Sequence, residues 1–512
     1  MAGQSKDNAM DHMVAVMFEN RSFDNLLGRL YQPGEVASFE GVAGKNLSNP
    51  IPEWSGDGAD RRAVPYGVAK DMGTPSPDPG EEYQHVNTQL FGLIDPPGNR
   101  GKLAAKMAVP YNAPTDSLRR PTMEGFVADY ISAFTAQIGR QPRYDEYAQI
   151  MSGYTPGQLP VMSGLARGFA TFDHWFCEVP SQTFTNRSFF HAGTASGYVV
   201  NTSPPESFPV RNPAETLFER LESKGLTWRV YCDPPSHVSF TGIIHASRLR
   251  SRFATNFFTT EQFLQDAEKG ELPTYSFIEP NMLHGHNDMH PGLPSAASSS
   301  LLGGEVLLAK IYDAVRSSSS SCGSNAHNTL LMVNFDEHGG TYDHVPPPPA
   351  SCPSPSAAAG QYGFAFDRSG VRVPAIAISA WIPEQTVVND EYRNTSVLRT
   401  MRDRWSLGPP FTSRDATAPD IAAVLSLDNP RLPEDWPDVA ARPVPQFDAA
   451  LVPPDAPLRP LPRAALNAVL ALAKELGQNV PDIRQDEAIN ETHGIAIIGE
   501  VFARMFPRLL SQ

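Results

Sequence analysis

The chain has 512 residues, of which 41% are hydrophobic and 19% are charged. This composition is typical of a globular protein and excludes a disordered chain. The net charge of −15 argues against nucleic acid as the main partner, because contacts to a phosphate backbone require clustered Lys and Arg. A phosphorylated substrate is compatible with this charge, since one bound cation can reverse the local field.

Short apolar runs alternate with helical segments along most of the chain, and this order predicts an α/β fold. We expect buried strands at residues 12–18, 226–231, 274–280, 329–335 and 371–383. We expect helices at residues 212–225, capped by Asn212, and at residues 259–270 and 304–316.

Two regions depart from this alternation. Residues 32–120 show little periodicity, and we expect them to cover an edge of the sheet or a cleft. After about residue 428 the chain is Pro-rich and then has two amphipathic segments, 462–476 and 494–510. We therefore predict a domain at 1–428 and a C-terminal appendage at 429–512. Its helices are expected to pack on the core, and a membrane or oligomer contact is the alternative.

The four cysteines are too widely spaced for a zinc finger. Cys322 and Cys352 could pair if the protein is exported, and four free thiols fit equally well. No apolar run is long enough to span a bilayer, and the N-terminal segment lacks the apolar core of a signal peptide. We expect a soluble protein, secreted or periplasmic if a signal peptide was removed and otherwise cytoplasmic.

Three of the predicted strands end in polar side chains that could bind a cation. These side chains are Glu19, Asn20 and Arg21 after the first strand, His284, His286 and His290 beyond the strand at 274–280, and Asp336, Glu337 and His338 after the strand at 329–335. Ligands bind at the carboxyl ends of the strands in open α/β sheets, so we expect these groups to converge. Their ligand types suit Mg, Mn, Ca or Zn. Each group alone could also be a solvated turn or a helix cap.

Residues 179–194, VPSQTFTNRSFFHAGT, supply candidate nucleophiles. The hydroxyl side chains are Ser181, Thr183, Thr185, Ser188 and Thr194. A hydroxyl bound to a metal loses its proton more readily and becomes a nucleophile. Arg187 could hold an oxyanion such as phosphate through its planar guanidinium. The residues alone do not choose among the hydroxyls, each of which could also fill an ordinary turn.

Six segments resemble, in order, the motifs of one family. They are MFENRSFDNLLG, DPGEEYQHVNTQLFG, VPSQTFTNRSFFHAGT, NDMHPG, NFDEHGGTYDHVPPP and RVPAIAISAWIP. The chain resembles the phosphoesterase group of bacterial phospholipases C and acid phosphatases with the plant non-specific phospholipases C, in the alkaline phosphatase superfamily. The resemblance runs from about residue 12 to about residue 425, and the C-terminal appendage lies outside it.

The resemblance implies a phosphoric ester hydrolase with a mostly parallel central sheet flanked by helices. Its metal ligands fall on Glu19, Asn20, Thr183, Asp336 and Glu337. The implied nucleophile is Thr183, which attacks phosphorus and forms a phosphothreonine intermediate. His290 is the implied catalytic histidine, which protonates the leaving alkoxide. Asn186 and Arg187 are the implied substrate-binding residues.

Two histidines of the family motifs are replaced. The motif written DPGH has Glu81 in place of its histidine, and we expect His85, four residues further on, to substitute for it. A late EHSS motif has Asn394 in place of its histidine.

The leading hypothesis is phospholipase C-like cleavage of a diester such as a phospholipid, and the first alternative is acid phosphatase action on monoesters. A lipid substrate predicts an apolar funnel and a possible peripheral contact with a membrane, whereas a monoester predicts extra cationic groups. A sulfatase-like hydrolase and an inactive binding protein are further alternatives. The sequence lacks a CxPxR signature, which argues against a sulfatase, and it keeps Thr183, Glu19 and Asp336, which argues against inactivity.

Overall fold

The centre of the molecule is an eight-stranded sheet with the strand order β13-β6-β12-β11-β1-β10-β8-β9. The computed structural model describes residues 5–116, 119–201, 208, 211–233, 238–283, 285–292, 297–318, 320–354, 359–445, 457–481, 483 and 488–505. The strands are β1 (His12–Phe18), β6 (Ala170–Phe172), β8 (Trp228–Cys232), β9 (Phe257–Thr259), β10 (Tyr275–Glu279), β11 (Thr329–Phe335), β12 (Ala375–Ile378) and β13 (Thr386–Val388). Only β12 runs antiparallel to its neighbours in this sheet. The predicted mostly parallel α/β fold is confirmed.

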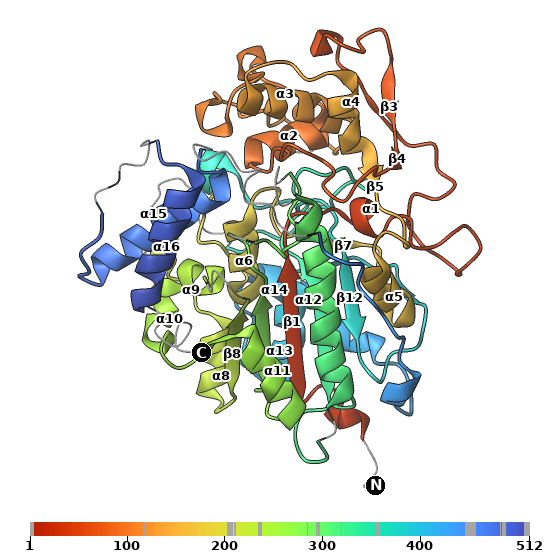
Figure 1. Ribbon diagram of the computed structural model, residues 1–512, viewed down its shortest axis with the longest axis vertical. Helices are drawn as coiled ribbons and strands as arrows, with labels where there is room; N and C mark the ends of the chain where they lie inside the picture. Colours follow the sequence, from red (N-terminus) through yellow and green to blue (C-terminus); the bar gives the residue numbers. More distant parts are fainter. Residues whose placement is uncertain are drawn as a thin grey trace.

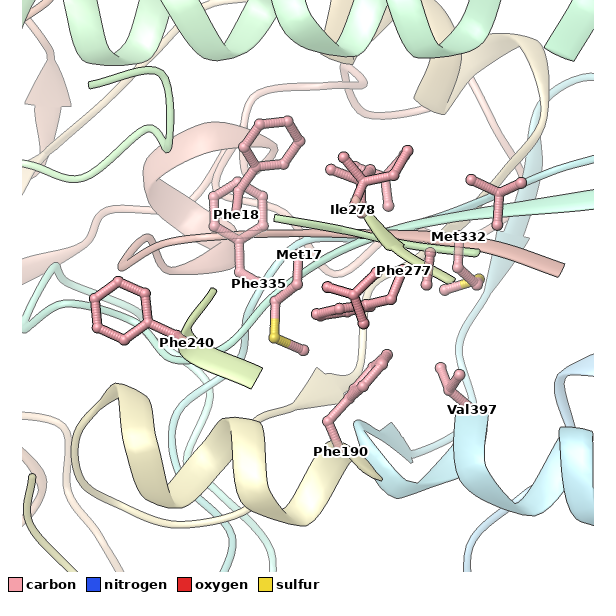
Figure 2. Packing of buried hydrophobic residues seen from close by; sticks show 14 of the residues in the cluster. Met17, Phe18, Phe190, Phe240, Phe277, Ile278, Met332, Phe335 and Val397 are labelled. Carbon is pink, nitrogen blue, oxygen red and sulfur yellow. The ribbon is translucent and has the colours of Figure 1, made fainter. Parts of the chain in front are cut away.

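Helices cover both faces of the sheet, which explains why its central strands are apolar runs without alternation. Every residue of β10 and β11 is buried. Figure 2 shows Phe190 of α6 (Thr183–Ala192) and Val397 of α13 (Thr395–Arg404) pointing at the sheet from one side. The long helix α12 (Ala297–Ser317) runs along the other side (Figure 2).

The predicted helix boundaries are partly wrong. The helix expected from Asn212 is α8 (Leu217–Ser223), capped by Thr216 in a capping box with Glu219. The Asn212 side chain instead makes tertiary hydrogen bonds with Ser188 and Ser196, and its contact with the N–H of Ala214 lies before the first residue of the helix. The helix expected at 304–316 belongs to α12, which begins at Ala297. The helix at 259–270 is confirmed as α11 (Thr260–Lys269), with Thr259 as its cap.

Most of residues 32–120 belongs to a small region that packs around its own hydrophobic cluster. Its elements are the strand pairs β2 (Ser48–Pro50) with β3 (Ala63–Pro65) and β4 (Gly67–Val68) with β5 (Ser152–Gly153), and the helices α2 (Tyr83–Phe91), α3 (Phe126–Ile138) and α4 (Tyr144–Tyr147). Figure 1 shows this region beyond the carboxyl end of β1, at the opposite end of the molecule from the N-terminus. It therefore caps the end of the sheet at which ligands bind in such folds.

The C-terminal helices α15 (Pro460–Glu475) and α16 (Glu491–Met505) pack on each other, and α15 contacts α9 (Phe240–Ile244) (Figure 1). Their buried apolar side chains belong to the main hydrophobic core, so packing on the core is confirmed. The boundary at residue 428 stays a prediction. The remaining helices and strands are α1 (Phe23–Leu26), α5 (Pro160–Gly168), α10 (Ala246–Leu249), α14 (Ser413–Ala416), β7 (Trp175–Phe176) and β14 (Tyr392–Arg393).

All four cysteines are free thiols, and Cys322 and Cys352 are not joined. Among the helices of the described residues, none combines the length and the apolar character needed to cross a membrane.

Candidate active site

The carboxylates at the ends of β1 and β11 lie side by side. Phe18 and Phe335 are register partners in this parallel pair, so Glu19 and Asp336 are the next residues on adjacent chains. Arg187 of α6 joins them: its Nε donates to Asp336 Oδ2 over 3.1 Å and its Nη2 to Glu19 Oε1 over 3.3 Å. The predicted convergence of these two groups is therefore present in the structure.

Two glycines after Glu337 let the chain segments of the site approach closely. Gly339 and Gly340 have φ values of 59° and 65°, which favour glycine. A Cβ atom on Gly339 would lie 2.3 Å from the carbonyl oxygen of Asn20, and one on Gly340 would lie 2.5 Å from the carbonyl oxygen of Gly80. Larger residues at these positions would push the three segments apart.

Asn20 is oriented by a carboxylate. Its φ of 60° lies in the left-handed region, which Asn tolerates better than most residues. Its Nδ2 donates to Glu81 Oε2 over 2.6 Å. Because the amide nitrogen is committed to this contact, Oδ1 points elsewhere, and it has no hydrogen-bond partner in the part of the chain that the structure describes.

Four buried oxygens of the predicted metal ligands lack a hydrogen-bond partner among the described residues: Glu19 Oε2, Asn20 Oδ1, Thr183 Oγ1 and Glu337 Oε1. Burial raises the pKa of Glu19 and that of Glu337, and the charge of Asp336 raises both further. Buried polar atoms normally have a partner, and hard oxygens are the ligands that Mg²⁺ and Ca²⁺ prefer. The residues present therefore fit a divalent cation.

Thr183 is the first residue of α6 and is fully buried. The turn before it is shaped by Asn186, whose Nδ2 donates to the carbonyl oxygens of Val179, Ser181 and Gln182. Thr183 and Arg187 are four residues apart and therefore lie on one face of the helix. This places the hydroxyl on the side of α6 that faces Glu19 and Asp336.

The two residues expected to bind substrate are engaged with the protein itself. Arg187 is buried and contacts Glu19 and Asp336, with Glu279 at 3.9 Å from its Nη1. Asn186 uses both side-chain atoms on backbone groups, since its Oδ1 also accepts from the N–H of Val179. Their substrate-binding role stays a prediction, and their contacts give both a positioning role.

His290 lies beside two carboxylates. Its Nδ1 is 2.7 Å from the carbonyl oxygen of Pro291, so the ring proton belongs on Nδ1 and Nε2 carries a lone pair. Nε2 is 3.8 Å from Asp78 Oδ2 and 3.8 Å from Glu81 Oε2. Burial lowers the pKa of His290 to about 4, so the ring is neutral at pH 7.

Glu81, which stands where the motif has histidine, is thus a member of the site. Its Oε1 accepts from Gln182 Nε2 over 3.2 Å, directly before Thr183. In the sequence Glu81 stands out only as a departure from the motif, and Asp78 was not among the predicted site residues. The DPGE segment, which carries both residues, was the signal that could have found them.

His85 is directed at a different partner. Its Nδ1 is 2.7 Å from Asp129 Oδ1, and although burial lowers its pKa, the charge and hydrogen bond of Asp129 outweigh this and raise the pKa to about 9. Gln89 extends the network from Asp129 to His338. These contacts engage His85 with Asp129 and give it a supporting role. Glu81, and not His85, therefore lies next to Asn20.

The histidines of the segment after β10 have different surroundings. His284 lies outside the described residues. His286 contacts Asp288 through Nδ1 over 2.9 Å and Arg459 through Nε2 over 3.1 Å. Arg459 directly precedes α15, so the C-terminal appendage reaches the edge of the site.

Asn394 donates to the backbone oxygen of Asp336 and anchors the end of β11.

Two sets of three His, Asp and Glu side chains in the described part of the chain bring their ligand atoms within 4.8 Å of one another. One set is Asp78, Glu81 and His290, and the other is Asp24, Asp343 and His344. Glu19, Asp336 and Glu337 do not form such a set, so a cation there would also need Asn20 and Thr183.

The comparisons with known proteins agree with this geometry. A model of the Phosphoesterase family matches residues 10–408. Non-specific phospholipase C3 of Arabidopsis thaliana is 31% identical over 448 residues, which cover 84% of this chain and 76% of the relative. Phospholipase C B of Mycobacterium tuberculosis is 28% identical over 347 residues, which cover 58% of this chain and 62% of the relative.

Solved structures overlap with this chain only weakly. A protein in the alkaline phosphatase superfamily from Vibrio parahaemolyticus has a TM-score of 0.31 at 11% identity, covering 52% of this chain and 65% of its own. The family model, the relatives and the converging motifs together establish that the chain belongs to the Phosphoesterase family and is a phosphoric ester hydrolase.

Proposed function

We propose that this hydrolase is a phospholipase C-type phosphodiesterase that acts through Thr183 and depends on a divalent cation. The observation that carries the proposal is the group of unpaired buried oxygens of Glu19, Asn20, Thr183 and Glu337. The named phospholipases C among the relatives favour a phospholipid head group as substrate. A peripheral contact with a membrane belongs to the same proposal.

The cations around Thr183 favour a diester over a monoester. Arg187 is tied to two carboxylates, and Arg21 donates to the backbone oxygens of Met289 and Thr74. A phosphomonoester carries up to two negative charges near neutral pH and requires extra cationic groups, whereas a diester carries one. Arg187 Nη1 and Arg21 Nη2 have no hydrogen-bond partner among the described residues. The charge of Arg187 is offset by Glu19 and Asp336, so the remaining positive charge suits one negative charge better than two.

Thr183 begins the proposed reaction by attacking phosphorus with Oγ1. The bond between phosphorus and the diacylglycerol oxygen breaks, and the phosphorylated head group stays on Thr183 as a phosphothreonine. The proton released from Thr183 Oγ1 ends on the leaving oxygen. Water then attacks phosphorus, the bond between phosphorus and Oγ1 breaks, Oγ1 regains a proton from that water, and the phosphorylated alcohol is released. A divalent cation held by the five predicted ligands would lower the pKa of the hydroxyl and offset phosphate charge.

Other residues of the chain position these groups. Asn186 holds the turn before Thr183, and the N-terminus of α6 favours negative charge at this point. His290 is neutral in the free enzyme, and its Nε2 is an acceptor rather than a donor. We assign to His290 the role of accepting a proton or binding a cation on the side of the leaving group.

The direct test is an assay of phosphatidylcholine, p-nitrophenyl phosphorylcholine and p-nitrophenyl phosphate, with and without a chelator. We expect the two diesters to be cleaved faster than the monoester and the chelator to stop all cleavage. Thr183→Ala should lower kcat by at least about 10³-fold, the loss expected for a nucleophile. Thr183→Ser, which keeps the hydroxyl, is the matched control and should retain part of the activity.

Full activity of Thr183→Ala would show that another group is the nucleophile. Faster cleavage of the monoester would show that the protein is a phosphatase and not a diesterase.

A further inference from the structure

Asp78, Glu81 and His290 form a second group of possible cation ligands beside Thr183. Asp78 and Glu81 lie on the segment before α2, and His290 lies on the segment after β10. Their ligand atoms lie within 4.8 Å of one another. The group is separate from Glu19, Asp336 and Glu337, and the hydrogen bond from Asn20 to Glu81 connects the two.

The His290 ring is the observation that points to a ligand. Its side chain is only 5% exposed, and its Nε2 lone pair faces two carboxylate oxygens at 3.8 Å, which is too long for a hydrogen bond. Three ligand atoms thus lie close together, and no hydrogen bond joins His290 Nε2 to either carboxylate. Ligands bound to one ion by bonds of about 2.0–2.2 Å lie roughly 3 to 4.3 Å apart, which includes the observed separations.

Neighbouring groups hold these ligands as they do in known metal sites. The carbonyl oxygen of Pro291 fixes the Nδ1 proton of His290, and the backbone N–H of His290 donates to Asp288. Glu81 is held by Asn20 and Gln182. Asp78 Oδ1 is buried and has no hydrogen-bond partner among the residues described.

The excess of carboxylates over guanidinium groups also favours more than one bound cation. The carboxylates of this region that influence one another are Glu19, Asp78, Glu81, Glu82, Asp288, Asp336 and Glu337. Two buried guanidinium groups, Arg21 and Arg187, and Arg459 at the rim oppose them. The carboxylates outnumber these three cations, so a second divalent cation makes the site more attractive to an anionic diester than one cation alone does.

We propose that Asp78, Glu81 and His290 bind a second divalent cation, next to the first ligand group and joined to it by the hydrogen bond from Asn20 to Glu81. The proposal rests on the proposed function and deepens it, because the second cation would offset charge on the leaving oxygen. It also gives a reason for the departure at residue 81, since a carboxylate in place of the motif histidine contributes a negative charge to this group.

The test counts Mn²⁺ bound to the metal-free full-length chain, by equilibrium dialysis with elemental analysis and by electron paramagnetic resonance. We expect two Mn²⁺ per chain with mutually broadened spectra. Asp78→Asn, Glu81→Gln and Glu19→Gln should each bind one. His344→Gln, which alters the other three-residue group, is the matched control and should bind two. Thermal unfolding identifies variants that fold, and Glu81→Gln replaces Asp78→Asn if the latter does not.

One Mn²⁺ per wild-type chain, or two in both Asp78→Asn and Glu81→Gln, would overturn the second site. If hydrolysis remained dependent on Thr183 and sensitive to a chelator, the proposed function would survive that result, and Nε2 of His290 would be the acceptor of a proton. No bound Mn²⁺ at any concentration tested would overturn both proposals.

Discussion

Two clusters of charged side chains lie on the same two chain segments, yet they differ in how completely their polar atoms are paired. Glu19 and Asn20 face Asp336 and Glu337 at the end of the sheet. Further along the same two segments, Asp24 faces Asp343 and His344. In the second cluster Arg372 donates to Asp24 over 2.9 Å and to Asp343 over 2.9 Å. Asp24 Oδ2 also accepts from the Nδ1 and the backbone N–H of His344.

The difference between these clusters lies in their unpaired atoms. None of the side-chain atoms of Asp24, Asp343, His344 and Arg372 is among the buried unpaired atoms of the described residues. The cluster at Glu19 keeps several such oxygens. We infer that the Arg372 cluster is closed and joins α1 to the segments that carry Asp343 and Arg372, whereas the Glu19 cluster is open and depends on a cation from outside. Ligand type and spacing alone do not separate a metal site from a structural ion pair.

The largest expected effect is on the closed cluster. Arg372→Met would leave the buried carboxylates of Asp24 and Asp343 without their cation, and we expect a loss of about 3–5 kcal/mol in the free energy of unfolding. Chemical denaturation at pH 7 measures it. The exposed pair of Arg399 with Asp403 is the control, and Arg399→Met should cost less than about 1 kcal/mol. Equal effects of the two variants would contradict the closed character of the Arg372 cluster.

A second closed pair, His85 with Asp129, should give a pH-dependent stability. The folded-state pKa of His85 is raised from 6.5 to about 9, so the stabilisation is fully present below about pH 6.5 and is lost as the pH rises through 9. Up to about 3 kcal/mol of the wild-type stability should disappear over this range, and His85→Gln should lack this loss. Denaturation of both proteins at pH 6.5, 8 and 9.5 measures the difference. A constant difference across the range would refute the ion pair.

The open cluster should respond to Glu19→Gln in the opposite direction from Arg372→Met. Burial raises the pKa of Glu19, so its charge disfavours the metal-free fold at neutral pH, and the variant should be at least as stable as the wild type. With Mn²⁺ at 100 times its Kd, the wild type should gain about 2.7 kcal/mol from this site, and the variant should gain less. Thermal unfolding with and without Mn²⁺ tests both signs. Loss of stability without metal would place Glu19 in a closed cluster.

The smallest expected effect on activity is at Arg459, at the edge of the site. Arg459 contacts His286 and Glu491 and is partly exposed. Arg459→Ala should lower kcat/KM for an anionic diester by less than about fivefold, and the loss should shrink at high salt. Arg504→Ala, which removes an exposed pair with Glu500 on the same appendage, is the control. A loss of more than 100-fold would make Arg459 part of the catalytic machinery.

The sequence alone determined the strands β1, β10 and β11 and the ligand groups that follow two of them. Fully buried parallel strands are continuous apolar runs, so their ends are visible wherever charged residues interrupt them. Glu19, Asn20, Asp336 and Glu337 could therefore be predicted as one site. Gly339 and Gly340 were visible for the same reason, because their role follows from a sharp turn after the ligands.

Tertiary structure decided which side chain faces which partner. His85 and Glu81 are both near the site in sequence, but α2 begins at Tyr83 and turns His85 toward Asp129, while Glu81 stays on the loop beside Asn20. Asn212 could cap a helix by its residue type, yet distant serines occupy its side chain. Residue type and local spacing limit what a side chain can bind, and only the packed neighbours from other segments decide which of those partners it meets.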